Sequence, residues 1–150
     1  MSLWPQGGSG TPRVLAGSGA ALVALAFSPD GKHLATAARD GSARVFAVAG
    51  AAPPRVLTGH TAAARSLAFS PDSQRLVTTA DDATARVWSL AGSTAPVVLR
   101  GHEGSVYAAS FSADSQRVVT AGQLKLFPGA PVIVSPAQLQ PDEPRAVSQR

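Results

Sequence analysis

Cysteine and asparagine are absent from this chain of 150 residues, and isoleucine, methionine and tyrosine occur once each. The lack of cysteine excludes disulfides and thiol chemistry, and nothing else in the sequence points to an oxidising compartment. No apolar run reaches the ~20 residues that a transmembrane helix needs. Residues 13–27 resemble a signal peptide in composition, but the pattern of residues 17–27 returns twice further along the chain. We therefore expect a cytoplasmic protein that does not contact a membrane.

Charge is sparse and of mixed sign, with 13 basic and 9 acidic residues and a formal net charge of +4. Most of the basic residues are Arg, and they are scattered along the chain without a run. Nucleic-acid binding is disfavoured, because it needs basic residues gathered in a patch. The composition is rich in Arg, Ala, Gly and Pro, which have GC-rich codons, and poor in Lys, Asn and Ile, which have AT-rich codons. This bias is typical of a GC-rich genome and predicts a bacterial source.

The chain repeats itself with a period of 42 residues. Phe-Ser-Pro-Asp at 27–30 returns at 69–72 and, as Phe-Ser-Ala-Asp, at 111–114. Residues 17–58 and 59–100 align without gaps and are identical at 21 of 42 positions. A period of about 20–50 residues is typical of repeat architectures, in which each unit is one supersecondary structure.

Each repeat unit divides into four short runs rich in Val, Leu, Ala, Phe and Thr. In the unit at 59–100 we predict strands at 64–70, 75–80, 84–90 and 96–100. Pro, Asp, Gly and Ser lie between these runs and favour turns. No segment has a helical period. We therefore expect four-stranded antiparallel meanders, with apolar residues on both faces where one sheet stacks on the next.

Four features of this unit carry a resemblance to a known family. They are Gly59-His60 at the start, Phe69-Ser70-Pro71-Asp72 after the first strand, Asp82 in the second turn, and Arg86-Val87-Trp88 in the third strand. The chain resembles the WD-repeat β-propeller family, whose units of roughly 40–45 residues form four-stranded blades. The resemblance implies an all-β fold of antiparallel blades that make up an incomplete propeller of about three blades.

The period also predicts how the chain is divided. Trp4 lies as far before Gly17 as Trp88 lies before Gly101, so Leu3-Trp4 is expected to end a third strand, with a fourth at 12–16. We expect five segments: the end of a partial preceding blade at 1–16, complete repeats at 17–58 and 59–100, a degenerate repeat at 101–135, and a Pro-rich disordered tail at 136–150.

The degenerate repeat loses the pattern near its end. Lys125–Phe127 fits the third strand only after a deletion that removes the turn Asp, and a further short strand is expected at 131–135. A closed propeller needs about 4–8 blades, which is more than this chain supplies. Three explanations stay open: the chain is a fragment of a larger protein, it is an open stack with frayed ends, or copies assemble so that partial blades complete one another.

One unit contains the three groups of a catalytic triad: the hydroxyl of Thr78, the imidazole of His60 and the carboxylate of Asp82. A triad normally occurs once, whereas parts of this set recur in the neighbouring units. The resemblance implies instead a structural tetrad, in which these side chains and Trp88 satisfy one another between the loops. The expected tetrad positions are His60, Thr78, Asp82, Trp88, His102, Thr120, Thr36 and Asp40.

No cofactor or metal is expected. The three histidines are dispersed, and neither Cys nor a His pair at helical spacing supports a zinc site. The Gly-rich stretches at 7–10 and 17–19 precede neither a helix nor Gly-Lys-Ser/Thr, so a phosphate site is unsupported.

The resemblance implies a scaffold for protein–protein interactions, in which loops on one face bind a protein or peptide. The residues expected on that face are Arg39, Arg65, Asp81 and Tyr107. Tyr and Arg are favoured interface anchors. In bacteria such repeats are often docking parts of larger regulatory proteins, such as Ser/Thr kinases or peptidases. Enzyme activity is not expected, because it would need convergent polar groups from several blades and two complete blades do not supply them. One rival stays open: a truncated, non-functional remnant.

Overall fold

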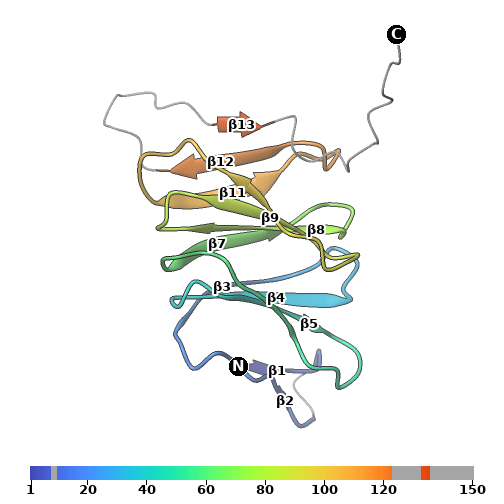
Figure 1. Ribbon diagram of the computed structural model, residues 1–150. Coiled ribbons are helices and arrows are strands. Elements are labelled where there is room, and N and C mark those ends of the chain that lie inside the picture. Colours follow the sequence, from blue (N-terminus) through green and yellow to red (C-terminus); the bar gives the residue numbers. More distant parts are fainter. Residues whose placement is uncertain (8–9, 123–132, 136–150) are drawn as a thin grey trace.

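The computed structural model describes residues 1–7, 10–122 and 133–135. These residues form antiparallel strands joined by turns, and none of them is helical. No helix able to cross a membrane therefore occurs in this part of the chain. The sheets are stacked in chain order, from the N-terminal strands at the bottom of Figure 1 to the last strands at the top.

Two complete sheets occupy the middle of the stack. The first sheet contains β3 (Leu22–Phe27), β4 (His33–Ala38), β5 (Ala43–Ala47) and β6 (Arg55–Leu57). The second sheet contains β7 (Ala64–Phe69), β8 (Arg75–Ala80), β9 (Ala85–Ser89) and β10 (Val97–Leu99). Both are meanders in which each strand pairs with the next along the chain. The all-β blades predicted from the repeat are confirmed, and each predicted strand of the second sheet ends within a residue of the observed one.

The strands at the two ends of the stack form smaller sheets. The terminal pair consists of β1 (Ser2–Leu3) and β2 (Arg13–Val14). The third sheet contains β11 (Val106–Phe111), β12 (Val118–Gly122) and β13 (Ile133–Ser135). The strand beside β12 is thus β13, whereas the third strand expected at 125–127 lies outside the described residues, as does the tail at 136–150.

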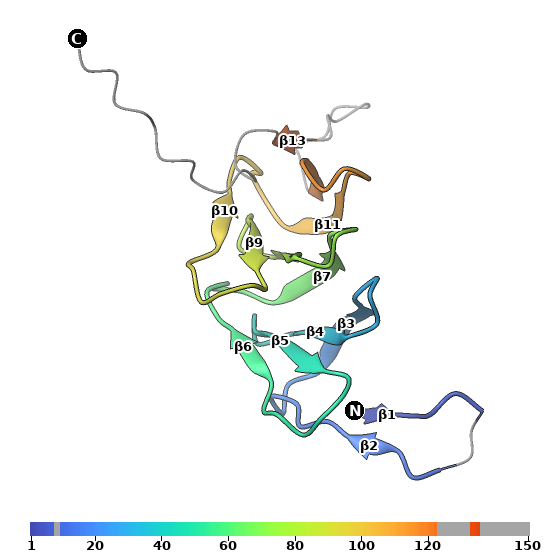
Figure 2. The same ribbon diagram turned by 90° about the vertical axis from the view of Figure 1, so that its right-hand side faces the viewer.

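The core lies between the sheets. Each sheet has a preceding face, which points toward the sheet before it, and a following face, which points toward the next. The first strands β3, β7 and β11 run along one side of the stack and the fourth strands β6 and β10 along the other (Figure 2). The largest apolar cluster fills the space between the first and second sheets, and a second cluster lies between the second and third.

The turn after each first strand links neighbouring sheets. Ser73 and Ser115 adopt positive φ angles of 59° and 60°. This conformation turns the Ser73 hydroxyl toward the preceding sheet, where it accepts a hydrogen bond from the backbone N–H of Asp30 at 3.1 Å. Ser115 accepts from the N–H of Asp72 at 3.3 Å in the same way. The repeated turn therefore fixes the spacing of the sheets as well as reversing the chain.

Candidate functional site

A β-bulge recurs at the same place in each first strand. The pairing with the second strand skips one residue at Val23 in β3, at Arg65 in β7 and at Tyr107 in β11. A bulge leaves one residue outside the ladder and re-aims its side chain, and bulges are common beside functional sites. All three bulged residues are exposed, with Tyr107 at 50%. The backbone therefore presents one side chain from each sheet to solvent.

Arg65 forms a bidentate ion pair with Asp81 of the same sheet. Its Nε donates to Oδ1 at 2.6 Å and its Nη2 to Oδ2 at 2.5 Å. These bonds, together with one from Ser105, hold the pKa of Asp81 below its ordinary value. The ion pair uses two of the five N–H donors that a guanidinium carries. Arg65 is therefore oriented in advance while keeping donor capacity.

The four predicted binding residues lie at the same end of the strands. Arg65 and Tyr107 are the second residues of β7 and β11, and Arg39 and Asp81 directly follow β4 and β8. The backbone N–H groups of Arg39 and Asp81 bond to carbonyls just before the first strands, each at 2.9 Å. Together with Val23 these four residues form what we call the loop face. The bulges were not predicted, because the aligned sequence shows which residues are equivalent but not where the ladder slips.

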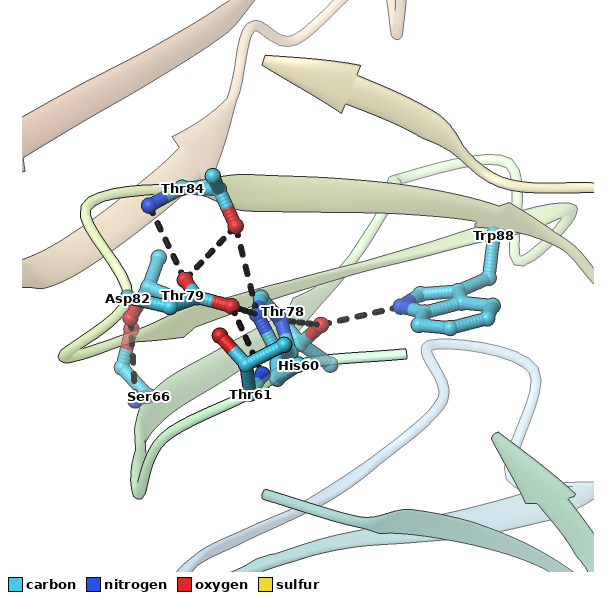
Figure 3. A network of polar contacts seen from close by, with 8 residues as sticks. All are labelled: His60, Thr61, Ser66, Thr78, Thr79, Asp82, Thr84 and Trp88. Atoms are coloured by element: carbon cyan, nitrogen blue, oxygen red, sulfur yellow. Dashed lines mark hydrogen bonds and ion pairs between the residues drawn. The ribbon is translucent and has the colours of Figure 1, made fainter. Parts of the chain in front are cut away.

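A buried polar network crosses the second sheet (Figure 3). The Nδ1 atom of His60 lies 2.9 Å from Oδ2 of Asp82, and Nε2 lies 2.9 Å from Oγ1 of Thr78. The indole N–H of Trp88 donates to the same Thr78 oxygen at 2.9 Å. The structure thus brings together the four tetrad residues expected in this unit.

The donors and acceptors of the network determine its protonation. A carboxylate can only accept, so Nδ1 of His60 carries the hydrogen and Nε2 accepts from the Thr78 hydroxyl. Burial is the largest influence on the pKa of His60 and leaves it below its ordinary value, although the hydrogen bond and the charge of Asp82 act in the opposite direction. At neutral pH the imidazole is therefore uncharged, and its contact with Asp82 is a hydrogen bond rather than an ion pair.

Asp82 receives more hydrogen bonds than its contact with His60. Thr84 donates to Oδ1 through its hydroxyl at 2.7 Å and its backbone N–H at 3.0 Å. The N–H of Thr61 donates to Oδ2 at 3.1 Å. Burial opposes ionisation, but the bonds from Thr84 and His60 leave the pKa of Asp82 below its ordinary value. Sequence reasoning missed both threonines. Thr84 could have been found, because an Asp side chain in a turn often bonds to the backbone two residues on, whereas no local signal indicates Thr61.

The network has the residue order of a Thr–His–Asp triad, but its hydroxyl does not face a substrate site. Thr78 is fully buried, and its oxygen accepts the indole N–H while its hydrogen is directed to His60. A nucleophile would need that oxygen accessible. What the arrangement can do is satisfy buried polar groups and hold the loops of the second sheet together. Within the described ranges no three His, Asp or Glu side chains gather as a metal site.

The third sheet carries part of the same network. Nε2 of His102 lies 2.8 Å from Oγ1 of Thr120, as in the second sheet. Its Nδ1 is buried and has no hydrogen-bond partner among the described residues. Burial lowers the pKa of His102 below its ordinary value. Two of the four tetrad positions are therefore paired here.

The first sheet has a different set of tetrad residues from the third sheet. Asp40 accepts from the N–H of Ser42 at 2.9 Å and from its hydroxyl at 2.6 Å, and these bonds lower its pKa. Thr36 is buried at the position of Thr78. Phe46 occupies the Trp88 position, is buried, and has no N–H to donate. Among the described residues, therefore, the second sheet alone connects an imidazole, a hydroxyl, a carboxylate and an indole.

Stacked four-stranded antiparallel meanders, one of which carries a complete His–Thr–Asp–Trp network, have the architecture of the class of β-propeller blades. The sequence pattern of the family described as "WD domain, G-beta repeat" matches residues 11–46, 51–89 and 94–123. The chain belongs to the WD40 repeat family. No curated protein matches it. Repeats of this family indicate a scaffold for protein interactions.

Proposed function

We propose that the protein is an interaction scaffold that binds a peptide or loop of another protein on the loop face. The recurring bulge carries this proposal, because it presents equivalent side chains from three successive sheets at one end of the strands. Two of those side chains, Arg65 and Tyr107, are of the types that dominate binding energy at protein interfaces.

The chemistry of the loop face suggests what it would recognise. Arg65 is held in place by Asp81, so less conformational freedom is lost when it contacts a partner. Its remaining donors suit carbonyl or carboxylate oxygens, and Tyr107 offers an aromatic surface one sheet away. Arg39 adds a positive charge beside the first sheet. We therefore propose a partner segment that combines backbone or acidic oxygens with an apolar side chain.

A selection from a random peptide library tests this function. Selected peptides are measured against the purified chain by fluorescence anisotropy. Tyr107→Ala and Arg65→Ala are each expected to weaken binding about tenfold or more, as interface anchors do. Gln116→Ala, at the opposite end of the strands, is the matched control and should leave binding unchanged. Failure to select any peptide, or binding that ignores both substitutions, would contradict the proposal.

The wider context stays a prediction from composition and family resemblance. It places the scaffold in the cytoplasm of a bacterium, as a docking part of a larger regulatory protein such as a kinase or peptidase. The rival interpretation, a non-functional remnant, is tested more simply. A cooperative thermal unfolding transition of the purified chain would contradict it, because a remnant that folds poorly has no such transition.

A further inference from the structure

The preceding face of the first sheet is covered only in part. Leu25 and Phe27 of β3 are 58% and 51% exposed. Their counterparts one repeat later, Leu67 and Phe69, pack into the cluster between the first and second sheets, and Leu67 is only 9% exposed. The residue types are identical, so the difference arises from the neighbouring sheet.

The terminal pair covers the outer half of that face. Leu3 lies opposite Arg13, as Val87 lies opposite Val97 two periods later, so β1 and β2 have the register of third and fourth strands. The apolar residues that they bring together with the first sheet are Met1, Leu3, Leu15, Leu34, Phe46 and Val48. In the described part of the chain β1 pairs with β2 alone. Among the described residues, no first or second strand lies beside β1 to cover Leu25 and Phe27.

The third sheet has the matching open surface at the other end of the stack. Between the first and second sheets, Leu67 and Phe69 pack in a cluster with small residues of β3 and β4, namely Ala24, Ala26, Ala35 and Ala37. The counterparts on the following face of β11 and β12 are Ala108, Ser110, Val119 and Ala121, all at least partly exposed. The bulged β11–β12 pairing repeats that of β3–β4. One chain thus carries both halves of an inter-sheet contact.

The polar network shows the same complementarity. Trp4, at the position of Trp88 two periods earlier, is 60% exposed, whereas Trp88 is 5% exposed and donates to Thr78. Thr120 occupies the Thr78 position in the third sheet and is hydrogen-bonded to His102. The N-terminal end of the chain therefore has an exposed indole with no hydroxyl acceptor from a neighbouring second strand among the described residues. The third sheet, at the other end, has a Thr120 hydroxyl that can accept an indole N–H.

We propose that two copies of this chain close head-to-tail into one ring. The terminal pair of each copy adds to β12 of the other, so that β11, β12 and the partner copy's β1 and β2 form a four-stranded blade. The register of the second sheet would set Leu3 opposite Val119 and Trp4 opposite Val118 across the two copies. Trp4 would then donate to Thr120, and β11–β12 would cover Leu25 and Phe27.

The number of copies follows from the number of strands. In its described residues each copy has two complete sheets, a half-blade of first and second strands (β11 and β12), and a half-blade of third and fourth strands (β1 and β2). The two halves make one blade, so each copy contributes three. Propellers close with about 4–8 blades, and two copies giving six is the only whole multiple of three in that range. The ring has two equivalent junctions and leaves no open edge at either half-blade.

Ring closure requires β13 to leave the edge of β12. β13 contributes three residue pairs to that edge, with Thr120 opposite Ile133. The incoming β1 occupies the same edge and brings β2 and the apolar side chains of the terminal pair with it. The exchange therefore replaces a single short strand by two strands and a buried inter-sheet contact. β13 acts as a removable cover of the joining edge in the single copy.

Molar mass measured by light scattering and sedimentation over about 1–100 µM tests the ring. We expect twice the mass of one chain, with dissociation on dilution. Phe27→Asp and Ala108→Asp, each at an exposed position of one joining surface, should weaken association at least a hundredfold. Ala52→Asp, at an exposed position of the loop between β5 and β6 and in neither joining element, is the matched control and should associate normally.

Mixing the two variants distinguishes head-to-tail association from a symmetric contact. A Phe27→Asp copy retains its third-sheet surface, and an Ala108→Asp copy retains its N-terminal surface. The mixture should therefore form a heterodimer through one intact junction, more tightly than either variant associates with itself. A mixture that stays monomeric while the unmodified chain is dimeric would overturn the head-to-tail arrangement.

Trp4 provides a spectroscopic readout. In Trp88→Phe, Trp4 is the remaining tryptophan, and its emission should shift to the blue and resist acrylamide quenching as the concentration rises. A dimer in which Trp4 stays exposed would overturn the strand pairing.

The mass measurement has two further outcomes that would overturn the proposal. If the protein has the mass of one chain at every concentration, the exposed face of the first sheet is covered by something else, such as a further segment or an unlike protein. Long polymers would overturn closure by two copies.

A gain of affinity is expected from one further change. Gly31 stands at the position of Ser73 and Ser115 and has a similar positive φ of 70°, with open space around it. At the proposed junction it would face the backbone N–H of Asp114 of the partner copy, without a hydroxyl to accept it. Gly31→Ser should lower the dimer dissociation constant about five- to hundredfold, in line with one added hydrogen bond at each of the two junctions. An unchanged or weaker dimer would contradict the register.

Discussion

The first and second sheets have closely related sequences but different surroundings. The second sheet is covered on both faces, by the largest apolar cluster on one side and a further cluster on the other. The first sheet shares that large cluster on its following face, while the described residues that pack on its preceding face are those of the terminal pair. The polar network differs as well, since Ser18 and Phe46 replace the imidazole and indole of the second sheet. A shared sequence pattern thus specifies the strands, whereas the neighbouring sheet determines how strongly each position is held.

The largest expected contrast is in the apolar core. Leu76→Ala should lower the free energy of unfolding by about 3–5 kcal/mol, because Leu76 is fully buried in the large cluster. Leu34→Ala, at the equivalent position against the terminal pair, should cost about 2–3 kcal/mol, since fewer groups pack there. Denaturant unfolding of both variants measures the difference. Equal losses would show that the terminal pair packs as well as a complete sheet.

A second contrast lies between two aspartates of the second sheet. Asp82→Ala should cost about 1–3 kcal/mol, because it leaves His60 and Thr84 without their acceptor in a buried network. Asp72→Ala removes bonds to Ser70 and Gln74 in an exposed turn and should cost less. The shifts in melting temperature give the order directly. Equal shifts would mean that the network contributes no more than an ordinary turn.

Trp88→Phe makes the second sheet resemble the first. Phe46 shows that phenylalanine is accommodated when buried at this position. The substitution removes the indole N–H from Thr78 and should cost about 0.5–1.5 kcal/mol through that bond. Thermal unfolding provides the measurement, with Phe46→Leu as a packing control in the sheet that lacks the bond. A neutral result would show that Thr78 finds another donor.

The smallest expected effect is the dependence of stability on pH. Burial puts the pKa of folded His60 below its ordinary value of 6.5. The unfolded chain therefore takes up more protons once the pH falls below about 6.5, so the stability from a neutral His60 is complete above that pH and declines below it. His60→Gln should flatten the fall in melting temperature between pH 7 and pH 5. His102 retains a similar dependence, so the slope should decrease without vanishing.

Much of this fold could be predicted because the period and the turn residues agree with each other. The strand positions of the second sheet follow from the alternation of apolar runs with Ser-Pro-Asp and Asp-Asp turns. The bulge at Arg65 and its ion pair with Asp81 could not be predicted, because they depend on ladder geometry in three dimensions. A short strand was expected at 131–135, where β13 lies, but its pairing with β12 could not be predicted, because the strand expected beside β12 was the one at 125–127.

The seryl turns that join neighbouring sheets have a consequence for how such a gene can change. Each seryl hydroxyl accepts a hydrogen bond from the backbone N–H of an aspartate in the preceding unit, 43 residues earlier. Removing residues 59–100 would place Ser115 where Ser73 stood, opposite Asp30, with the spacing intact. Recombination between equivalent codons would therefore delete or duplicate a unit without spoiling the junction. Any two units can therefore be neighbours with the same hydrogen bond between their turns. The number of repeats can change by whole units while this contact between sheets stays the same.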